Sequence, residues 1–329
     1  MDLGSQIVLL NFSIIMFINM FDIKEAAQKL KDGFLVAFPT ETVYGLGADA
    51  TNQESVARIF EIKNRPKDHP LIVHLSSIDQ LPDWAIDISK YANELANAFW
   101  PGPMTLILKR NNIAQDFITG GQETVGIRIP NHKIALSLLE EFKKIGSGAI
   151  AAPSANKFGK VSPTSFEHVK SEIGKDLSQD DLILDGGISL VGIESTIIDC
   201  TGPSPKVLRP GAITDKMIED VTGMQLSKQV SDIRVSGSFS SHYAPSAKVV
   251  LDVEPQQGDG FIALAQFETP VGVTRLISPN TVEEFAQELY SAFHIADQMN
   301  LQRIVVVPPH GDDLALAIRD RLLKASNGK

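Results

Sequence analysis

Cysteine is almost absent from this chain, with Cys200 alone among 329 residues. A single thiol excludes an intrachain disulfide and a cysteine-built metal centre, and it is typical of proteins from reducing compartments. We therefore expect a cytoplasmic protein that is stabilised by packing rather than by cross-links, with no metal site of its own.

Basic residues are also in the minority. Lys and Arg number 30 against 40 Asp and Glu, which gives a formal net charge of −10. This balance argues against a protein that coats nucleic acid without specificity, although it permits a local basic pocket. Aromatic residues make up 7% of the chain and are not interleaved with basic ones, so a stacking platform for single-stranded RNA is not indicated.

No apolar run reaches the length of a membrane span. Residues 6–21 are strongly apolar, but a spanning helix needs roughly 20 such residues. No Lys or Arg precedes the run and no small-residue cleavage site follows it, so a signal peptide is not favoured. We interpret residues 1–21 as an N-terminal extension, or as a leader upstream of a true start at Met16 or Met20. A membrane anchor is the less favoured alternative, and no stable membrane association is expected.

Apolar runs and amphipathic segments alternate along the chain, which predicts an α/β fold. Strands are predicted at residues 34–38, 71–75, 104–108, 124–129, 149–152, 181–184, 195–199, 206–208, 249–253, 260–264 and 304–307. Helices are predicted at residues 23–31, 52–63, 86–99, 132–144, 165–173, 281–298 and 313–326, with a helix and tail at 213–230.

The domain organisation follows from length and composition. A chain of 329 residues is long for one core, and the Ser- and Gly-rich stretch 231–241 lacks apolar periodicity. We predict a larger domain over residues 22–230 with a twisted, mostly mixed sheet. A linker or lid over 231–247 follows, and then a smaller Rossmann-like α/β domain over 248–329.

The most informative stretch is residues 34–75. Its first strand leads into the sequence PTETVYGLG, a predicted polar turn with two glycines, and its helix ends in KNRPKDHP. Hydroxyls, glycines and three cations in these loops suit a phosphate-bearing ligand. Residues 45–50, GLGADA, formally fit a dinucleotide fingerprint, but six residues separate them from the strand, so a nicotinamide site is not predicted.

These motifs closely resemble the threonylcarbamoyl-AMP synthases of the YrdC-domain family. The resemblance rests on PTETVYGLG (39–47), KNRP (63–66), PLIVH (70–74), PSAN (153–156), SPT (162–164) and EST (194–196). It is strong over residues 21–211. Further on, HYAP (242–245) resembles the interdomain signature of the two-domain branch, whereas the preceding SGSFSS departs from it.

The resemblance implies a nucleotidyltransferase that converts L-threonine, bicarbonate or CO₂, and ATP into threonylcarbamoyl-adenylate and pyrophosphate, with Mg²⁺ accompanying the ATP. It also implies a downstream transferase that modifies adenosine beside the tRNA anticodon. An RNA-binding module without ATP turnover is the alternative from another class. A carbamoyl transferase that acts on carbamoyl-phosphate is a third alternative. The single cysteine argues against it, because such proteins usually carry zinc-binding modules built from several cysteines.

The candidate site residues are carried over from the family motifs. Without the resemblance, Lys63 and Arg65 would be interpreted as cations that interact favourably with the dipole at the C-terminal end of a helix. His74, which lies in an apolar strand, would be interpreted as a core residue. With the resemblance, Lys63 and Arg65 are expected to be catalytic and to grip ATP phosphates. Threonine binding is expected at Thr40, Tyr44, His74, Thr105 and Ser195, and ATP binding at Lys63, Arg65, Arg128, Ser154, Asn156, Ser162, Arg209 and Tyr243.

Overall fold

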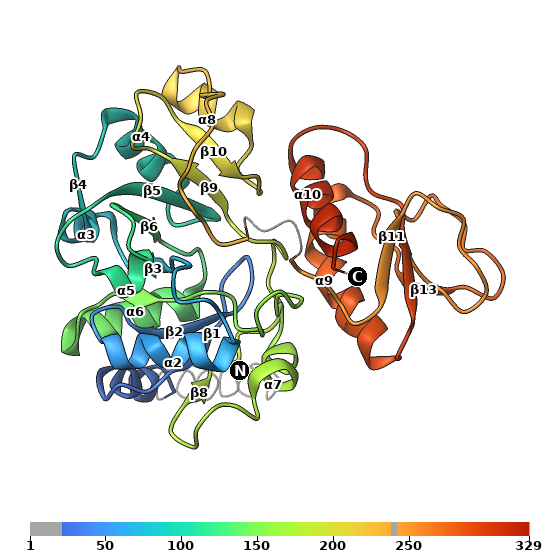
Figure 1. The fold of residues 1–329 in the computed structure, drawn as a ribbon, viewed down its shortest axis with the longest axis horizontal. Helices are drawn as coiled ribbons and strands as arrows, with labels where there is room; N and C mark the ends of the chain where they lie inside the picture. The colour runs from blue at the N-terminus through green and yellow to red at the C-terminus, as the bar shows by residue number, and fades with distance from the viewer. Residues whose placement is uncertain (1–21, 238–241, 329) are drawn as a thin grey trace, which may run out of the picture.

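The computed structural model describes residues 22–237 and 242–328. It has the predicted α/β class, with a large mixed sheet in an N-terminal domain and a smaller parallel sheet in a second domain (Figure 1). The expectations for residues 1–21 lie outside the described residues, and the predicted domain boundaries stay predictions. In the described ranges, no helix combines the length and the apolar character needed to cross a bilayer.

Ten strands form the N-terminal sheet, in the order β10-β9-β5-β6-β3-β7-β2-β1-β8 with β4 beside β5. Their bounds are β1 Val36–Phe38, β2 Gly45–Asp49, β3 Ile72–His74, β4 Ala85–Ile86, β5 Met104–Arg110, β6 Thr124–Arg128, β7 Ile150–Ala151, β8 Leu182–Ile183, β9 Thr196–Asp199 and β10 Lys206–Arg209. Strands far apart in the chain therefore meet, and β5 pairs in parallel with β9.

The helices of this domain begin at polar caps, as local sequence dictates. The Asn52 side chain accepts hydrogen bonds from the backbone N–H groups of Glu54 and Ser55, which starts α2, and Ser165 caps α7 in the same way. The helices are residues 22–31, α2 Gln53–Lys63, α3 Leu81–Trp84, α4 Lys90–Phe99, α5 Asp116–Thr119, α6 Lys133–Ile145, α7 Phe166–Ile173 and α8 Asp215–Thr222, with a 3₁₀ turn η1 Ile78–Gln80.

The prediction of a glycine turn through Gly47 is wrong, because Gly45–Asp49 forms β2 and pairs antiparallel with β1. The turn is confined to residues 40–43. A Cβ on Gly47 would lie 2.7 Å from Ile150 Cγ2 and 2.9 Å from a ring carbon of Phe38. This glycine therefore permits close packing beside the sheet rather than a special turn conformation.

Two other differences concern short elements. The predicted helix 86–99 begins only at Lys90, because residues 85–86 pair with β5 as β4 and Ser89 provides the helix cap. Helices α3 and α5 and the later strand β13 (Thr274–Ile277) were not predicted. Elements of four residues carry too little periodicity to be recognised from sequence.

The second domain has a four-stranded sheet in the order β11-β14-β12-β13, with every neighbouring pair parallel. The remaining elements are β11 Lys248–Leu251, β12 Gly260–Ile262, β14 Arg303–Val306, α9 Val282–Gln298 and α10 Leu314–Ser326. Both helices lie between this sheet and the N-terminal domain (Figure 1). They are therefore the elements that meet the first domain.

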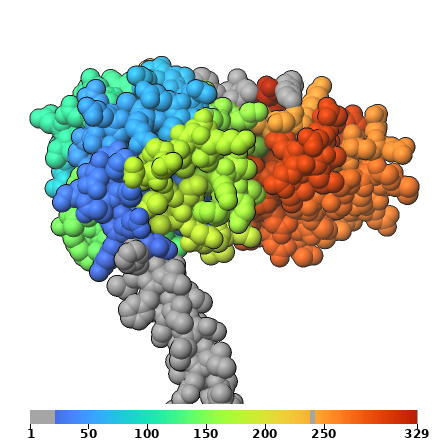
Figure 2. Space-filling model, turned by 90° about the horizontal axis from the view of Figure 1, so that it is seen from below, coloured from blue at the N-terminus to red at the C-terminus, as the bar shows by residue number. Residues whose placement is uncertain are grey.

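The two domains share an apolar cluster, and the space-filling view shows them in direct contact (Figure 2). Val161 and Ile193 of the first domain pack in this cluster with Phe285 and Leu289 of α9. Gly192 lies so close to α9 that an added Cβ would be 2.4 Å from the Ala286 carbonyl oxygen. The domains are consequently joined by a packed interface as well as by the linker.

Candidate functional site

A cavity in the N-terminal domain gathers most of the predicted site residues. The sequence-predicted residues among its lining are Thr40, Tyr44, Arg65, His74, Arg128, Ser154, Ser195, Arg209 and Tyr243. The other four lie behind the lining. Lys63, Thr105 and Ser162 each form a hydrogen bond to a lining residue, and the Asn156 carbonyl accepts from Lys63.

The position of Arg65 follows from the end of α2. Asn64 adopts a left-handed conformation with φ of 51°, which turns the chain out of the helix. The Arg65 guanidinium donates to the Pro70 carbonyl at 2.9 Å and to the Ser236 hydroxyl at 3.1 Å. It also lies over the Phe158 ring, 5.8 Å from its centroid. Burial lowers the pKa of Arg65 to about 10, so the group stays charged at neutral pH.

Lys63 is only two residues from Arg65 in the sequence, but its side chain binds different partners. Its ammonium group donates to the Ser154 carbonyl at 2.5 Å and to the Asn156 carbonyl. Burial, and then the charge of Arg65, lowers the pKa of Lys63 well below its usual value. Lys63 thus ties α2 to the loop that follows β7, beneath the cavity rather than in its lining.

Arg209, Ser195 and Thr105 form a second buried polar group at the cavity. Thr105 Oγ1 lies 2.8 Å from Ser195 Oγ, because β5 and β9 pair in parallel. Arg209 donates to the Ser195 carbonyl at 2.8 and 3.0 Å and to the Ser195 hydroxyl at 3.1 Å. Its remaining terminal nitrogen donates to the Ser236 carbonyl at 3.0 Å. The linker residue Ser236 therefore contacts both Arg65 and Arg209.

These two arginines are buried, and in the described residues their guanidinium groups donate to neutral oxygens. Arg65 is 7% exposed and Arg209 is 4% exposed, and no carboxylate in the described parts of the chain forms an ion pair with either. By contrast, Arg128 is paired with Glu41 at 2.8 Å. Burying an unpaired charge is unfavourable, so the cavity favours an anionic ligand.

The hydroxyls and the imidazole near the β1–β2 turn are largely used within the protein. Thr40 donates to the Val43 carbonyl at 2.6 Å, and Tyr44 donates to the Gly187 carbonyl at 2.7 Å. His74 Nδ1 lies 3.2 Å from the Ile72 carbonyl oxygen. Burial, together with the charge of Arg128, lowers the pKa of His74 to about 3. His74 therefore presents a neutral ring to the cavity.

Four polar lining residues were not among the predicted site residues: Thr42, Glu194, Ser236 and His242. Glu194 was detectable, because a carboxylate next to a predicted substrate-binding serine in an apolar segment is unusual. It accepts hydrogen bonds from Ser162 at 2.6 Å and from Tyr290 of α9 at 3.0 Å. Ser236 was not predicted as a site residue, because it lies in a stretch whose composition predicts only a linker.

The carboxylates in and next to the cavity are paired with arginines. Glu41 pairs with Arg128, and Glu194 pairs with Arg321 of α10 at 2.8 Å. Nowhere in residues 22–237 or 242–328 do three or more His, Cys, Asp or Glu side chains form a candidate metal site.

Comparisons with known proteins agree on one group. The family described as "Telomere recombination" (Sua5/YciO/YrdC) matches residues 28–211, and the "Threonylcarbamoyl-AMP synthase, C-terminal domain" family matches residues 213–327. A threonylcarbamoyl-AMP synthase of Pyrococcus abyssi is 40% identical, over 94% of this chain and 95% of the relative. One of Bacillus subtilis is 38% identical, over 93% of each. The crystal structure of P. abyssi Sua5 complexed with L-threonine superposes with a TM-score of 0.84 at 38% identity, over 94% of this chain and 95% of that one.

Proposed function

The chain belongs to the threonylcarbamoyl-AMP synthases of the YrdC-domain family, and we propose that it makes threonylcarbamoyl-AMP and pyrophosphate from L-threonine, bicarbonate or CO₂, and ATP. One observation carries the proposal. Two buried guanidinium groups without a direct ion-pair partner in the described residues, Arg65 and Arg209, line one cavity together with Ser195, whose hydroxyl contacts Thr105 behind it. The relative of P. abyssi has been crystallised with L-threonine, which supports threonine as a substrate here.

The reaction needs no nucleophile from the protein. The threonine nitrogen forms a bond to the carbon of bicarbonate with loss of water, or to that of CO₂ with loss of a proton, and gives an N-carboxylate. An oxygen of this group attacks the α-phosphorus of ATP, and the bond from that phosphorus to the pyrophosphate oxygen breaks. The protein has to supply position, and positive charge where phosphate charge develops.

Arg65 and Arg209 supply that charge in our proposal. A guanidinium offers a planar fork of donors that fits phosphate oxygens, and both groups are buried, where electrostatic interactions are strong. Ser195, backed by Thr105, is proposed to hold threonine. Because Ser195 Oγ lies 3.1 Å from a nitrogen of Arg209, the amino acid and the nucleotide would meet at this point.

The remaining predicted residues fall into two groups. Thr40, Tyr44 and His74 are proposed to shape the threonine end of the cavity, and Arg128, Ser154, Asn156, Ser162 and Tyr243 the nucleotide end. For Lys63 we propose a supporting part, since it holds the loop of Ser154 and Asn156 by their carbonyls. A direct contact of Lys63 with phosphate would require these bonds to break.

Mg²⁺ is proposed to arrive as part of the ATP substrate. The protein carboxylates near the cavity are engaged with arginines, so the phosphates are the better ligands for this hard cation. When bound, the ion would neutralise phosphate charge during displacement of pyrophosphate.

The linker is proposed to close over the substrates. Ser236 contacts both cavity arginines, and Tyr243 is buried against the second domain. A closed linker would shield the mixed anhydride product from water. We also propose a cytoplasmic location, with a transferase taking up the product to modify adenosine next to the tRNA anticodon; the family resemblance supports this last step.

The deciding experiment is pyrophosphate release from ATP and Mg²⁺, with and without L-threonine and bicarbonate. Release that requires both co-substrates is expected. Release without threonine would indicate another acceptor. No release from well-folded protein, combined with steeply salt-dependent RNA binding, would favour the RNA-binding alternative.

A further inference from the structure

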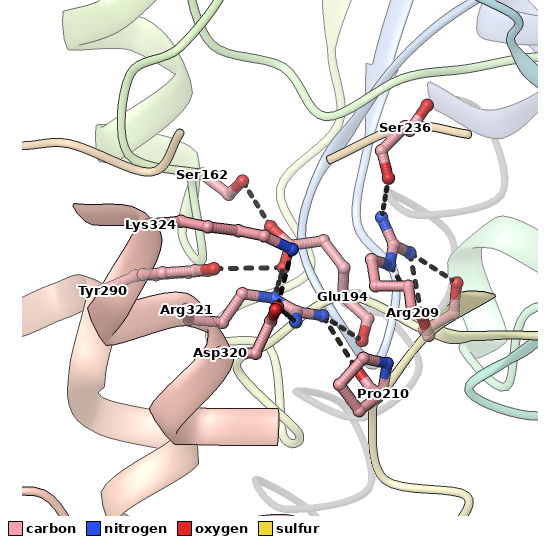
Figure 3. A network of polar contacts seen from close by, with 10 residues as sticks. Ser162, Glu194, Arg209, Pro210, Ser236, Tyr290, Asp320, Arg321 and Lys324 are labelled. Carbon is pink, nitrogen blue, oxygen red and sulfur yellow. Dashed lines mark hydrogen bonds and ion pairs between the residues drawn. The ribbon is translucent and has the colours of Figure 1, made fainter. Parts of the chain in front are cut away.

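One side chain of the second domain reaches three segments of the cavity at once. Arg321 of α10 is completely buried. It donates to Glu194 Oε2 at 2.8 Å and to the Pro210 carbonyl at 3.0 Å (Figure 3), and its guanidinium lies 5.3 Å from the centroid of the Tyr243 ring. Glu194 immediately precedes Ser195, Pro210 immediately follows Arg209, and Tyr243 belongs to the linker.

Both carboxylate oxygens of Glu194 accept hydrogen bonds from buried side chains. Ser162 donates to Oε1 at 2.6 Å, while Tyr290 and Arg321 donate to Oε2 at 3.0 and 2.8 Å (Figure 3). Burial alone would raise the pKa of Glu194, but the charges of Arg321 and then Arg209 outweigh it and lower the pKa to about 2. Glu194 is therefore a permanent carboxylate with both oxygens engaged, which makes it an anchor rather than a proton acceptor.

Linker residues His242 and Tyr243 contact α10 and α9 of the second domain. The His242 N–H donates to the Lys324 carbonyl of α10 at 3.2 Å, and the Tyr243 ring stacks on Tyr290 of α9, with centroids 5.8 Å apart. Tyr243 has φ of 61°, a left-handed conformation that is unfavourable for a bulky residue and persists only where its surroundings enforce it. The second domain provides those surroundings.

Attachment of the domains does not depend on Arg321 alone. The shared apolar cluster and a stacked histidine pair, His168 on α7 and His294 on α9 with centroids 3.9 Å apart, also join them. The polar contacts of Arg321 can therefore be removed while the packed interface remains.

We propose that Arg321 is a positioning residue for the synthase reaction, which holds Ser195 and Arg209 through Glu194 and Pro210 and seats the linker through Tyr243. The inference deepens the proposed function and rests on it. It assigns a task to the second domain, which is to fix the threonine and nucleotide ends of the cavity relative to each other. A displacement of about 1 Å at a reacting group lowers rates by roughly 100-fold, so such a contact matters without touching substrate.

The test compares Arg321→Met with Arg319→Met. Arg319 lies on the same helix, but its guanidinium binds the carbonyls of Pro309 and Gly311 within its own domain. We expect Arg321→Met to raise the KM for threonine and to lower kcat, with a combined loss of roughly 10- to 100-fold in kcat/KM. Arg319→Met should match the wild type. A purely structural Arg321 would lower thermal stability and leave kcat and KM of the folded enzyme unchanged, and that result would overturn the proposal.

A double variant tests whether Arg321 acts through Glu194. If it does, Glu194→Gln combined with Arg321→Met should be about as impaired as the worse single variant, because both remove one interaction. Independent, multiplying losses would contradict the proposal. Should Arg321→Met not fold, Arg321→Lys and Tyr290→Phe replace it, since the first keeps the charge and the second removes only the hydroxyl on Glu194.

Hydrogen–deuterium exchange separates this inference from the proposed reaction. In the enzyme without substrates, Arg321→Met should exchange faster than Arg319→Met over residues 194–211 and 242–247. Unchanged exchange there would overturn the positioning role even in an active enzyme. If the wild type releases no pyrophosphate, the proposed function fails, and the exchange comparison still decides whether α10 orders these segments.

Discussion

Arg65 donates a hydrogen bond to the hydroxyl of Ser236, a residue 171 positions further along the chain. The carbonyl of the same serine accepts from Arg209. The linker thus offers one hydroxyl and one carbonyl oxygen to the two cavity arginines that lack carboxylate partners. Neutral oxygens satisfy these donors only partly, so a phosphate is the stronger partner for both.

Removal of the Arg65 charge should abolish most of the activity. We expect Arg65→Ala to lower pyrophosphate release by roughly 100- to 1,000-fold, the loss typical of removing one preorganised charge or donor for a transition state. The fold should persist, because this guanidinium binds loop and linker oxygens rather than the core. Lys67→Ala, an exposed cation in the same loop, is the matched control. Turnover at the wild-type rate would remove Arg65 from the mechanism.

Ser195→Ala should act mainly on threonine. The lost hydroxyl is expected to raise the KM for threonine by about tenfold, the size of one hydrogen bond to a substrate, while the KM for ATP changes less. Thr105→Val keeps the volume and removes the hydroxyl that meets Ser195 Oγ at 2.8 Å, so it should give a smaller effect in the same direction. Equal effects on both substrates would argue against a threonine-binding Ser195.

Gly237 is expected to require the absence of a side chain. A Cβ there would lie 2.2 Å from the Tyr243 hydroxyl, so Gly237→Ala should displace Tyr243 and lower turnover by about tenfold. Gly121→Ala is a suitable control because Gly121 has a similar φ of 76°, against 80° at Gly237, and its Cβ would meet nothing within 4 Å. If both variants lose the same activity, backbone strain is the cause and linker closure is not.

Chelation of Mg²⁺ should stop the reaction without destabilising the protein. The described residues contain no cluster suited to a metal, so EDTA should abolish pyrophosphate release and leave the melting temperature unchanged. Excess Mg²⁺ should restore activity fully. A melting temperature that falls on chelation would instead indicate a metal held by the protein.

The His168–His294 stack should make stability depend on acid pH. Burial lowers the pKa of each imidazole to about 4, against an ordinary value of about 6.5, and the charge of His294 adds to the effect on His168. The unfolded chain then binds more protons between these pH values, so the free energy of unfolding should fall as pH drops from about 6.5 towards 4. Urea unfolding across this range measures the slope, and His294→Gln should reduce it. An unchanged slope in that variant would assign the acid sensitivity to other groups.

Local sequence patterns predicted much of the fold because most of its elements are long enough to show periodicity and carry their own caps. The helix over residues 52–63 and its cation pair are examples, and so is the strand that contains His74. The direction of Lys63 was not predictable, because its carbonyl partners lie some 90 residues away. The glycines of β2 were misread as a turn, since only the fold reveals Ile150 and Phe38 packed against Gly47.

Partners across the domain interface were the hardest to foresee. Glu194 and Arg321 are 127 residues apart, and neither position has a local pattern that points to the other. The motif around Ser195 predicted a binding serine, but it contained no information about what holds the preceding carboxylate. Ser236 was hidden for the same reason, because its partners Arg65 and Arg209 come from distant strands and loops.

The Glu194–Arg321 pair also limits how the two domains can be recombined. Each domain has its own sheet and helices, so they look like interchangeable modules. An exchange that keeps Glu194 without Arg321 would leave a buried carboxylate without its ion-pair partner, which typically costs about 3–5 kcal/mol. Chimeras of related chains should therefore be joined so that both residues come from one parent. In such experiments the two domains of this protein should be exchanged together rather than one at a time.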